Sequence, residues 1–171
     1  MAKLDNYLER KTAAIADRKQ DWTAEPEKAV ATVKASSKVA GITGARPTTM
    51  GSYTIISDSA PGLAGHSLGP TAPEMLLGAL ASCIVHTYFI HAVLVNIPLD
   101  DVAVDISGSI DYKPVIGMPS LDRPAITDIH YHAQVESPAD AAAIEQLHAA
   151  VEANCPVLNT LRYPTTIQRD R

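Results

Sequence analysis

The chain has 171 residues, of which 46% are hydrophobic and 19% are charged, and its formal net charge is −5 at pH 7. A chain of this size and composition fits one globular domain that buries its own core without disulfides or metals. The acidic balance lacks the basic footprint that nucleic acids and anionic membranes require, so we expect neither as a partner.

The N-terminal residues alternate charges with single apolar side chains and lack the continuous apolar stretch of a secretory signal. We therefore expect a reducing, cytoplasmic location, where two cysteines stay free or bridge only transiently. Apolar residues at roughly helical spacing predict an amphipathic helix over residues 3–22. We interpret residues 1–27 as a helical extension and residues 28–171 as the main domain.

Residues 28–56 predict strands, because β-branched residues gather at Val30, Thr32 and Val33 and again at residues 53–56. The segment between them, GITGARPTTMG, is rich in turn-forming residues and predicts a long or bulged hairpin connection. The following segment, DSAPGLAGHSLGP, predicts a loop.

Residues 75–99 contain no Asp, Glu, Lys or Arg, which predicts a long apolar helix ended by Asn96 and Pro98. A bilayer core needs about 20 apolar residues, and this stretch satisfies that count. However, Asn96 and two histidines interrupt the stretch, and no basic flank marks a cytoplasmic side. We therefore interpret it as the buried central helix of a soluble fold.

The remaining elements follow in the order strand, strand, helix, short helix and strand, at residues 102–110, 126–135, 138–153, 155–161 and 165–168. This order predicts an α+β fold in which an antiparallel sheet wraps around the long central helix. Because one sheet cannot cover so apolar a helix on all sides, we expect a second subunit to complete the cover in a two-fold homodimer.

The chain has two cysteines, Cys83 and Cys155, which lie so far apart in sequence that only the fold can pair them. Cys83 lies within the apolar helix, where plain burial is the usual explanation of a lone cysteine. Cys155 precedes Pro156 at the predicted start of a helix, where the first-turn amides stabilise a thiolate. Plain packing is an alternative explanation of this second cysteine too.

Two stretches, GPTAPEMLLGALASC ending at Cys83 and ANCPVLNTLRYP containing Cys155, resemble the paired signatures of the OsmC/Ohr family of osmotically inducible and organic hydroperoxide resistance proteins. The resemblance spans residues 28–171. It implies an OsmC-like fold, an intertwined homodimer whose two long helices pack centrally, and active sites at the subunit interface.

The resemblance also implies a two-cysteine peroxidase. Cys83 would be the peroxidatic thiol that attacks an organic hydroperoxide and becomes a sulfenic acid. Cys155 would be the resolving thiol that converts this acid to a disulfide, and a thiol or a dithiol such as a lipoylated protein would reduce the bridge. No cofactor and no bound metal are implied.

The residues that activate the thiol in this family are an arginine from an N-terminal strand or loop and a glutamate ten residues before the helical cysteine. Here Pro73 occupies the glutamate position. Glu74, one residue later, falls on the opposite face of a straight helix, and with Thr71 it forms a Thr-x-x-Glu capping box, which is the explanation we favour. Arg46 is the best match for the arginine, although a solvated turn residue explains it equally well.

Two further groups of residues are candidates. Arg162 lies one to two turns after Cys155 and is an alternative activating arginine. His86 follows Cys83 by three residues, so it forms either a Cys-His pair or an ordinary core or interface histidine. His130 and His132 alternate along a strand, but two ligands without a third make no metal site, and an exposed strand face explains them better.

A second function fits the same residues: a non-catalytic OsmC-like dimer that binds an apolar small molecule or lipid at the subunit interface. The displaced carboxylate motivates this alternative. The separation of the two sulfurs distinguishes the hypotheses, because a disulfide requires Cα atoms within about 7 Å.

Overall fold

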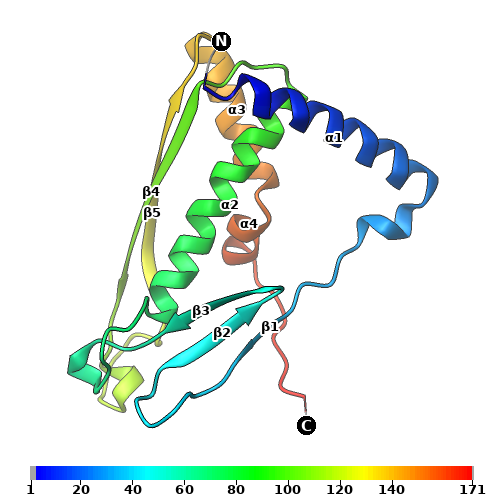
Figure 1. Cartoon of the computed structure of the whole chain (residues 1–171). Helices are drawn as coiled ribbons and strands as arrows, with labels where there is room; N and C mark the ends of the chain where they lie inside the picture. Colours follow the sequence, from blue (N-terminus) through cyan, green and yellow to red (C-terminus); the bar gives the residue numbers. More distant parts are fainter. Residues whose placement is uncertain (1–2, 171) are drawn as a thin grey trace. The chain divides into compact units, whose positions relative to one another are not determined.

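The computed structural model describes residues 3–170, so three terminal residues of the predicted extension and domain lie outside the described part. The chain forms two compact units, one made of the residues up to 18 together with those from 77 onward, the other made of residues 19–76. Two helices, α1 (Asp5–Ala24) and α2 (Ala72–Leu94), each have residues in both units. Figure 1 labels the two helices.

Helices and strands occur in the mixture expected for an α+β fold. The remaining α-helices are α3 (Ala141–Asn154) and α4 (Pro156–Arg162). The strands are β1 (Ala35–Ser37), β2 (Arg46–Met50), β3 (Tyr53–Ser57), β4 (Asp101–Ile110) and β5 (Ile126–Glu136), and three short 3₁₀ turns cover Pro26–Ala29, Pro61–Leu63 and Pro114–Ile116. The strands form two antiparallel sheets, β1-β2-β3 and β4-β5, where the sequence predicted one.

The β2-β3 hairpin lies partly where the sequence predicted only a turn. Met50 pairs with Tyr53 across a two-residue connection, and Gly51 adopts a φ of 58° there, which glycine accommodates without strain. The glycines and proline of this segment favoured a turn over a strand at Thr48 and Thr49. In the structure, the Thr48 hydroxyl bonds to that of Ser37 in β1 at 2.9 Å, and the Thr49 hydroxyl bonds to that of Thr54 in β3 at 3.0 Å. The predicted strand at residues 30–33 is wrong, because these residues are exposed and pair with no strand in the described part of the chain.

The loop predicted after β3 is confirmed, and the buried carboxylate of Asp58 organises it. This carboxylate accepts hydrogen bonds from the amides of Ser59, His66 and Leu68 at 2.8, 2.9 and 3.3 Å. These amides, His66 first, hold the pKa of Asp58 below its usual value. Gly65 closes the loop tightly, since a Cβ there would lie 1.8 Å from the Ser59 carbonyl oxygen.

The β4-β5 hairpin confirms the two strands predicted from alternation. Its register runs from Asp101 opposite Glu136 to Ile110 opposite Ile126, with a bulge near Gly108. The predicted last strand at residues 165–168 is wrong. Ile167 in that segment is 91% exposed, and no described strand pairs with the segment, so it lacks a surface on which to bury its apolar side chains.

The core of the unit that contains the hairpin gathers around α2. Its buried members come from α2, β4, α3, α4 and their connections, and they are Leu80, Ile84, Tyr88, Ala92, Leu99, Val102, Leu147, Val151, Cys155 and Leu158. Leu4, just before α1, and Leu8 of α1 pack against this core, and the Tyr7 ring meets the Phe89 ring edge-on at 5.2 Å. The N-terminal part of α1 is therefore anchored on α2.

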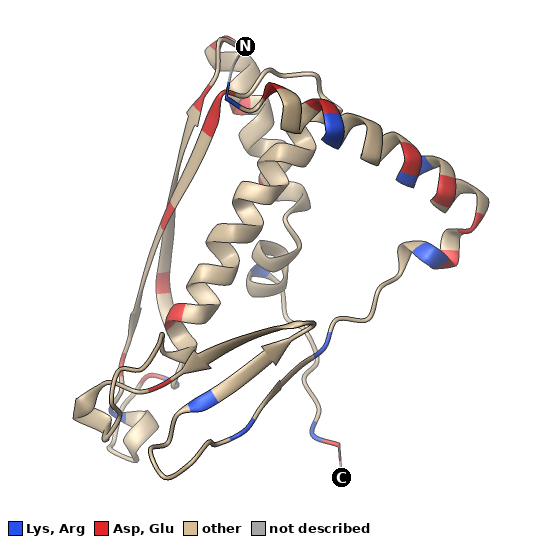
Figure 2. Ribbon diagram, viewed as in Figure 1, with Lys and Arg blue, Asp and Glu red and all other residues tan. Residues whose placement is uncertain are grey.

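Helix α2 carries one charged residue, Glu74 in its first turn, and is otherwise uncharged along its length (Figure 2). Among the described helices it is the one long and apolar enough to cross a bilayer by length and composition. The core helix of a soluble protein meets the same criteria, and Leu80, Ile84 and Tyr88 of α2 are almost fully buried within the protein.

Replacing Leu147 with alanine is expected to lower the free energy of unfolding by about 3 kcal/mol, because this fully buried side chain leaves a cavity in the core. Urea unfolding followed by circular dichroism measures the effect. Leu121→Ala is the matched control, since Leu121 is fully exposed and its loss should change stability by less than about 0.5 kcal/mol. Equal effects of the two substitutions would contradict the assigned core.

Candidate functional site

The two cysteines meet inside one unit. Cys83 lies half-buried in the third turn of α2, and Cys155 is fully buried at the junction between α3 and α4. Both thiols are free, and Cys83 packs against the core cluster that contains Cys155, close enough for the Cys155 thiol to shift the pKa of the Cys83 thiol. Two free thiols brought together by the fold from distant points in the sequence are candidates for a redox pair.

The groups around Cys83 have opposite effects on the pKa of its thiol. Burial raises the pKa of the Cys83 thiol above its usual value, and the neighbouring Cys155 thiol raises it further. The backbone amide of Val157, in the first turn of α4, donates to the Cys83 sulfur and opposes this rise, as does Thr87. No described cation is among the groups that shift this pKa, so full activation of the thiol requires a positive charge beyond these neighbours.

Arg46, the predicted activating arginine, belongs to the other compact unit. It begins β2, is half-buried, and its guanidinium donates to the Gly44 carbonyl oxygen at 2.9 Å. Local hydrogen bonding thus shapes the turn that precedes the strand.

Glu74 forms the capping box that the sequence predicted. Its carboxylate accepts from the Thr71 amide at 2.7 Å and from the Thr71 hydroxyl at 2.8 Å, and the Glu74 amide donates back to this hydroxyl at 3.4 Å. The Thr71 amide bond is the main reason that the pKa of Glu74 lies below its usual value. The carboxylate is therefore engaged in starting α2.

His86 pairs with α1 rather than with Cys83. The Lys11 ammonium donates to Nε2 of His86 at 3.0 Å, and burial together with this ammonium lowers the pKa of His86. His130 and His132 are exposed on β5, and the described residues contain no group of three side chains suited to hold a metal ion.

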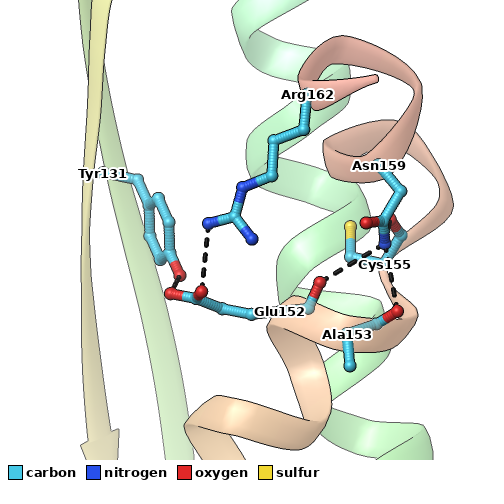
Figure 3. A network of polar contacts seen from close by, with 6 residues as sticks. All are labelled: Tyr131, Glu152, Ala153, Cys155, Asn159 and Arg162. Atoms are coloured by element: carbon cyan, nitrogen blue, oxygen red, sulfur yellow. Dashed lines mark hydrogen bonds and ion pairs between the residues drawn. The ribbon is translucent and has the colours of Figure 1, made fainter. Parts of the chain in front are cut away.

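The sequence did not predict a polar network that lies next to Cys155. The Tyr131 hydroxyl donates to Oε1 of Glu152 at 2.7 Å, and the Arg162 guanidinium donates to Oε2 at 3.0 Å (Figure 3). These two bonds hold the pKa of Glu152 below its usual value, whereas burial and Glu152 raise the pKa of Tyr131. Arg162, considered from sequence as an activating arginine, is therefore paired with a carboxylate.

A small cavity of about 170 Å³ adjoins this network. Side chains from α2, β5 and α4 line it, namely Leu80, Ile129, Tyr131, Leu158, Leu161 and Arg162. Leu80 lies one turn before Cys83, and Leu158 follows the residue whose amide contacts the Cys83 sulfur. The cavity is thus mainly apolar with a polar end.

The Glu152 network makes the fold sensitive to acid. Because its folded-state pKa lies below the ordinary value of 4.5, ionised Glu152 contributes stability that is present above pH 4.5 and is lost as pH falls through the folded pKa. We expect Glu152→Gln to destabilise the protein at pH 7 and to have a smaller effect at pH 3. Urea unfolding at both pH values measures this, with the exposed Glu145→Gln as control. Equal losses for Glu152→Gln at the two pH values would contradict it.

The chain is similar to a known protein family in sequence and to solved structures in fold. A model of the OsmC-like protein family matches residues 65–169. An OsmC like protein from Mycoplasma pneumoniae shares the fold with a TM-score of 0.66 and 20% identity, covering 77% of this chain and 88% of its own. An organic hydroperoxide resistance protein OsmC from Legionella pneumophila does so with a TM-score of 0.61 and 20% identity, covering 78% and 90%.

An OsmC-like protein of unknown function from Vibrio cholerae also shares the fold, with a TM-score of 0.61 and 14% identity, covering 77% of this chain and 94% of its own. No curated protein matches the chain by sequence. At these identities the three structures establish the fold.

Proposed function

Because the chain belongs to the OsmC-like protein family, we propose that it is a thiol-dependent peroxidase that reduces organic hydroperoxides to alcohols in oxidative-stress defence. The observation that carries this proposal is the packing of Cys83 against the core cluster that contains the second free cysteine, Cys155. The relative from Legionella pneumophila, named an organic hydroperoxide resistance protein, supports the same substrate class.

The proposed reaction begins at Cys83. Its thiolate attacks the distal oxygen of the hydroperoxide, so that an S–O bond forms, the O–O bond breaks, and the released alkoxide takes a proton to become an alcohol. Cys83 is left as a sulfenic acid. The Cys155 thiol then attacks this sulfur, forming a disulfide and releasing water. A dithiol, such as a lipoylated protein in a reducing cytoplasm, reduces the bridge and is itself oxidised to a disulfide.

The activating cation in this proposal is Arg46. Arg162 is already paired with Glu152, whereas the Arg46 guanidinium donates to the uncharged carbonyl oxygen of Gly44. A guanidinium near Cys83 would add to the Val157 amide in lowering the pKa of the thiol. Since Glu74 is engaged in the capping box, Arg46 would act without the carboxylate that accompanies the arginine elsewhere in the family.

The proposed active form is an intertwined homodimer. Helix α2 has a single charged residue, and Leu94 at its end is 41% exposed, which supports cover from a second subunit. Size-exclusion chromatography with light scattering should give twice the mass of the 18.2 kDa chain. A monomer at micromolar concentration would contradict this assembly.

Stopped-flow measurement of peroxide consumption tests the proposed activity. An organic hydroperoxide and hydrogen peroxide are compared, each with a dithiol and with a monothiol as reductant. We expect the organic hydroperoxide with the dithiol to be consumed fastest, because the apolar surroundings of Cys83 favour an organic substrate and a dithiol completes reduction of the bridge intramolecularly. No consumption of either peroxide would contradict the proposal.

A second candidate function, binding of an apolar small molecule or lipid without catalysis, is favoured by the apolar cavity beside Leu80 and Leu158 and by the raised pKa of Cys83. Saturable binding of a fluorescent fatty acid by a protein that consumes no peroxide would select this function. Rapid peroxide consumption by the same preparation would reject it.

A further inference from the structure

The end of α3 and the start of α4 are joined by one side chain. The Asn159 amide nitrogen Nδ2 donates to three backbone carbonyl oxygens, those of Glu152 at 3.3 Å, Ala153 at 3.2 Å and Cys155 at 2.9 Å (Figure 3). The last carbonyls of a helix lack partners within the helix, so this side chain caps α3 from α4. Removing it would take this partner from the carbonyls of Glu152 and Ala153, just before Cys155, while the Cys155 carbonyl would keep its bond from the Asn159 backbone amide.

The far end of α4 is held by charge. Arg162, its last residue, donates to Oε2 of Glu152, and the other oxygen of this carboxylate accepts from Tyr131 of β5 (Figure 3). We refer to the side chains of Glu152, Asn159 and Arg162 as the α3-α4 clamp. It fixes both ends of a helix that is only seven residues long and therefore has little stability of its own.

Cys155 lies in the chain between Glu152 and Asn159, two of the clamp residues. The Cys155 amide donates to the Val151 carbonyl at 2.9 Å, and its carbonyl accepts from the Asn159 backbone amide at 3.0 Å as well as from the Asn159 side chain. The Cys155 side chain is fully buried and belongs to the same core cluster as the buried Leu158 of α4. With α4 in place, the sulfur has one redox-active neighbour, the Cys83 thiol, and no path to solvent.

We infer that Glu152, Asn159 and Arg162 are positioning residues that hold the Cys155 sulfur buried against Cys83, and that α4 must lift from α3 before an external thiol reaches that sulfur. This inference rests on the proposed function for its redox consequence. An external dithiol thiolate attacks Cys155 in the Cys83–Cys155 bridge, Cys83 leaves as a thiolate, and the second thiol of the dithiol then releases Cys155 while the dithiol becomes a disulfide. The clamp thereby sets the rate of this attack at Cys155.

Alkylation of Cys155 tests the inference without any peroxide. In a Cys83→Ser protein, Cys155 is the sole cysteine, and iodoacetamide labelling followed by mass spectrometry gives its rate of exposure. We expect Asn159→Ala to accelerate labelling about tenfold and Arg162→Gln about threefold, because the first removes three hydrogen bonds and the second an exposed ion pair. Arg162→Lys keeps the charge and should restore the rate to within about twofold of the parent.

Thr160→Ala is the matched control on the same helix. Its exposed hydroxyl bonds to the Pro156 carbonyl within α4 at 2.8 Å and does not join α4 to α3, so labelling should stay at the parental rate. Hydrogen exchange distinguishes the proposed positioning role of the clamp residues from a general effect on the stability of the protein. The α4 amides should exchange faster in Asn159→Ala and Arg162→Gln by more than the change in the urea midpoint accounts for, while the β5 amides follow the midpoint.

Two outcomes would overturn the inference: labelling of Cys155 unchanged in both clamp variants, or labelling accelerated only in proportion to global unfolding. Failure of the proposed function would give a different result, because it affects peroxidase activity and not the labelling of Cys155. A protein without peroxidase activity whose Cys155 labelling still follows the clamp retains the positioning role and loses only its redox consequence.

Discussion

Cys83→Ser is expected to reduce peroxide consumption to the uncatalysed background, because a serine hydroxyl at this position cannot form the sulfenic acid on which the cycle depends. Cys155→Ser should keep the first step and stop at the sulfenic acid, since the neighbouring Cys155 thiol is then missing. Stopped-flow peroxide consumption measures the first effect, and labelling with a sulfenate-specific nucleophile followed by mass spectrometry locates the second at Cys83.

The double variant Cys83→Ser with Cys155→Ser is the control for non-specific oxidation. Wild-type rates of peroxide consumption in both single variants would reject the two-cysteine mechanism. A sulfenate that accumulates on Cys155 in the Cys83→Ser protein would instead reverse the proposed roles of the two thiols.

Arg46→Gln is expected to lower the rate of Cys83 oxidation by an organic hydroperoxide about 100-fold, because the unaided thiol has a raised pKa and needs a cation to hold its thiolate. The thiolate form supports the reaction above the pKa of Cys83, so losing the cation should move the rise of the pH-rate profile to higher pH. Stopped-flow oxidation rates across pH measure both effects, and Arg46→Lys should recover part of the rate.

Two further arginines serve as comparisons. Arg123 is exposed, and Arg123→Gln should leave the rate and the pH profile unchanged. Arg162 is paired with Glu152, so Arg162→Gln should leave the pH profile of Cys83 oxidation in place. A profile displaced by Arg162→Gln and unaffected by Arg46→Gln would transfer the activating role to Arg162.

Local patterns in the sequence were sufficient to predict several structural elements. The Thr71-x-x-Glu74 pattern predicted a capping box, and both partners form it, because such a box depends on residues within one turn. The alternation at residues 102–110 and 126–135 predicted β4 and β5, since each strand buries one face. The fold brings Cys83 and Cys155 into one cluster, and the disulfide between them that the family resemblance implied stays a prediction.

Other features depend on partners that no local pattern reveals. β2 forms in a segment rich in glycine and proline because Thr48 and Thr49 find strands on both sides. The segment at 165–168 has strand-like residues but no strand beside it in the described chain. His86 bonds to Lys11, and Tyr131 bonds to Glu152, across separations that only the folded chain closes. Glu152 therefore carried no sign, in sequence, of its place next to Cys155.

The most direct test of the central claim is the state of the two thiols after reaction with one equivalent of an organic hydroperoxide. Peptide mapping by mass spectrometry under non-reducing conditions should find a peptide pair cross-linked through Cys83 and Cys155, which a dithiol returns to two free thiols. Recovery of both cysteines as free thiols, with the hydroperoxide unconsumed, would contradict the assignment of this pair as a peroxidase site.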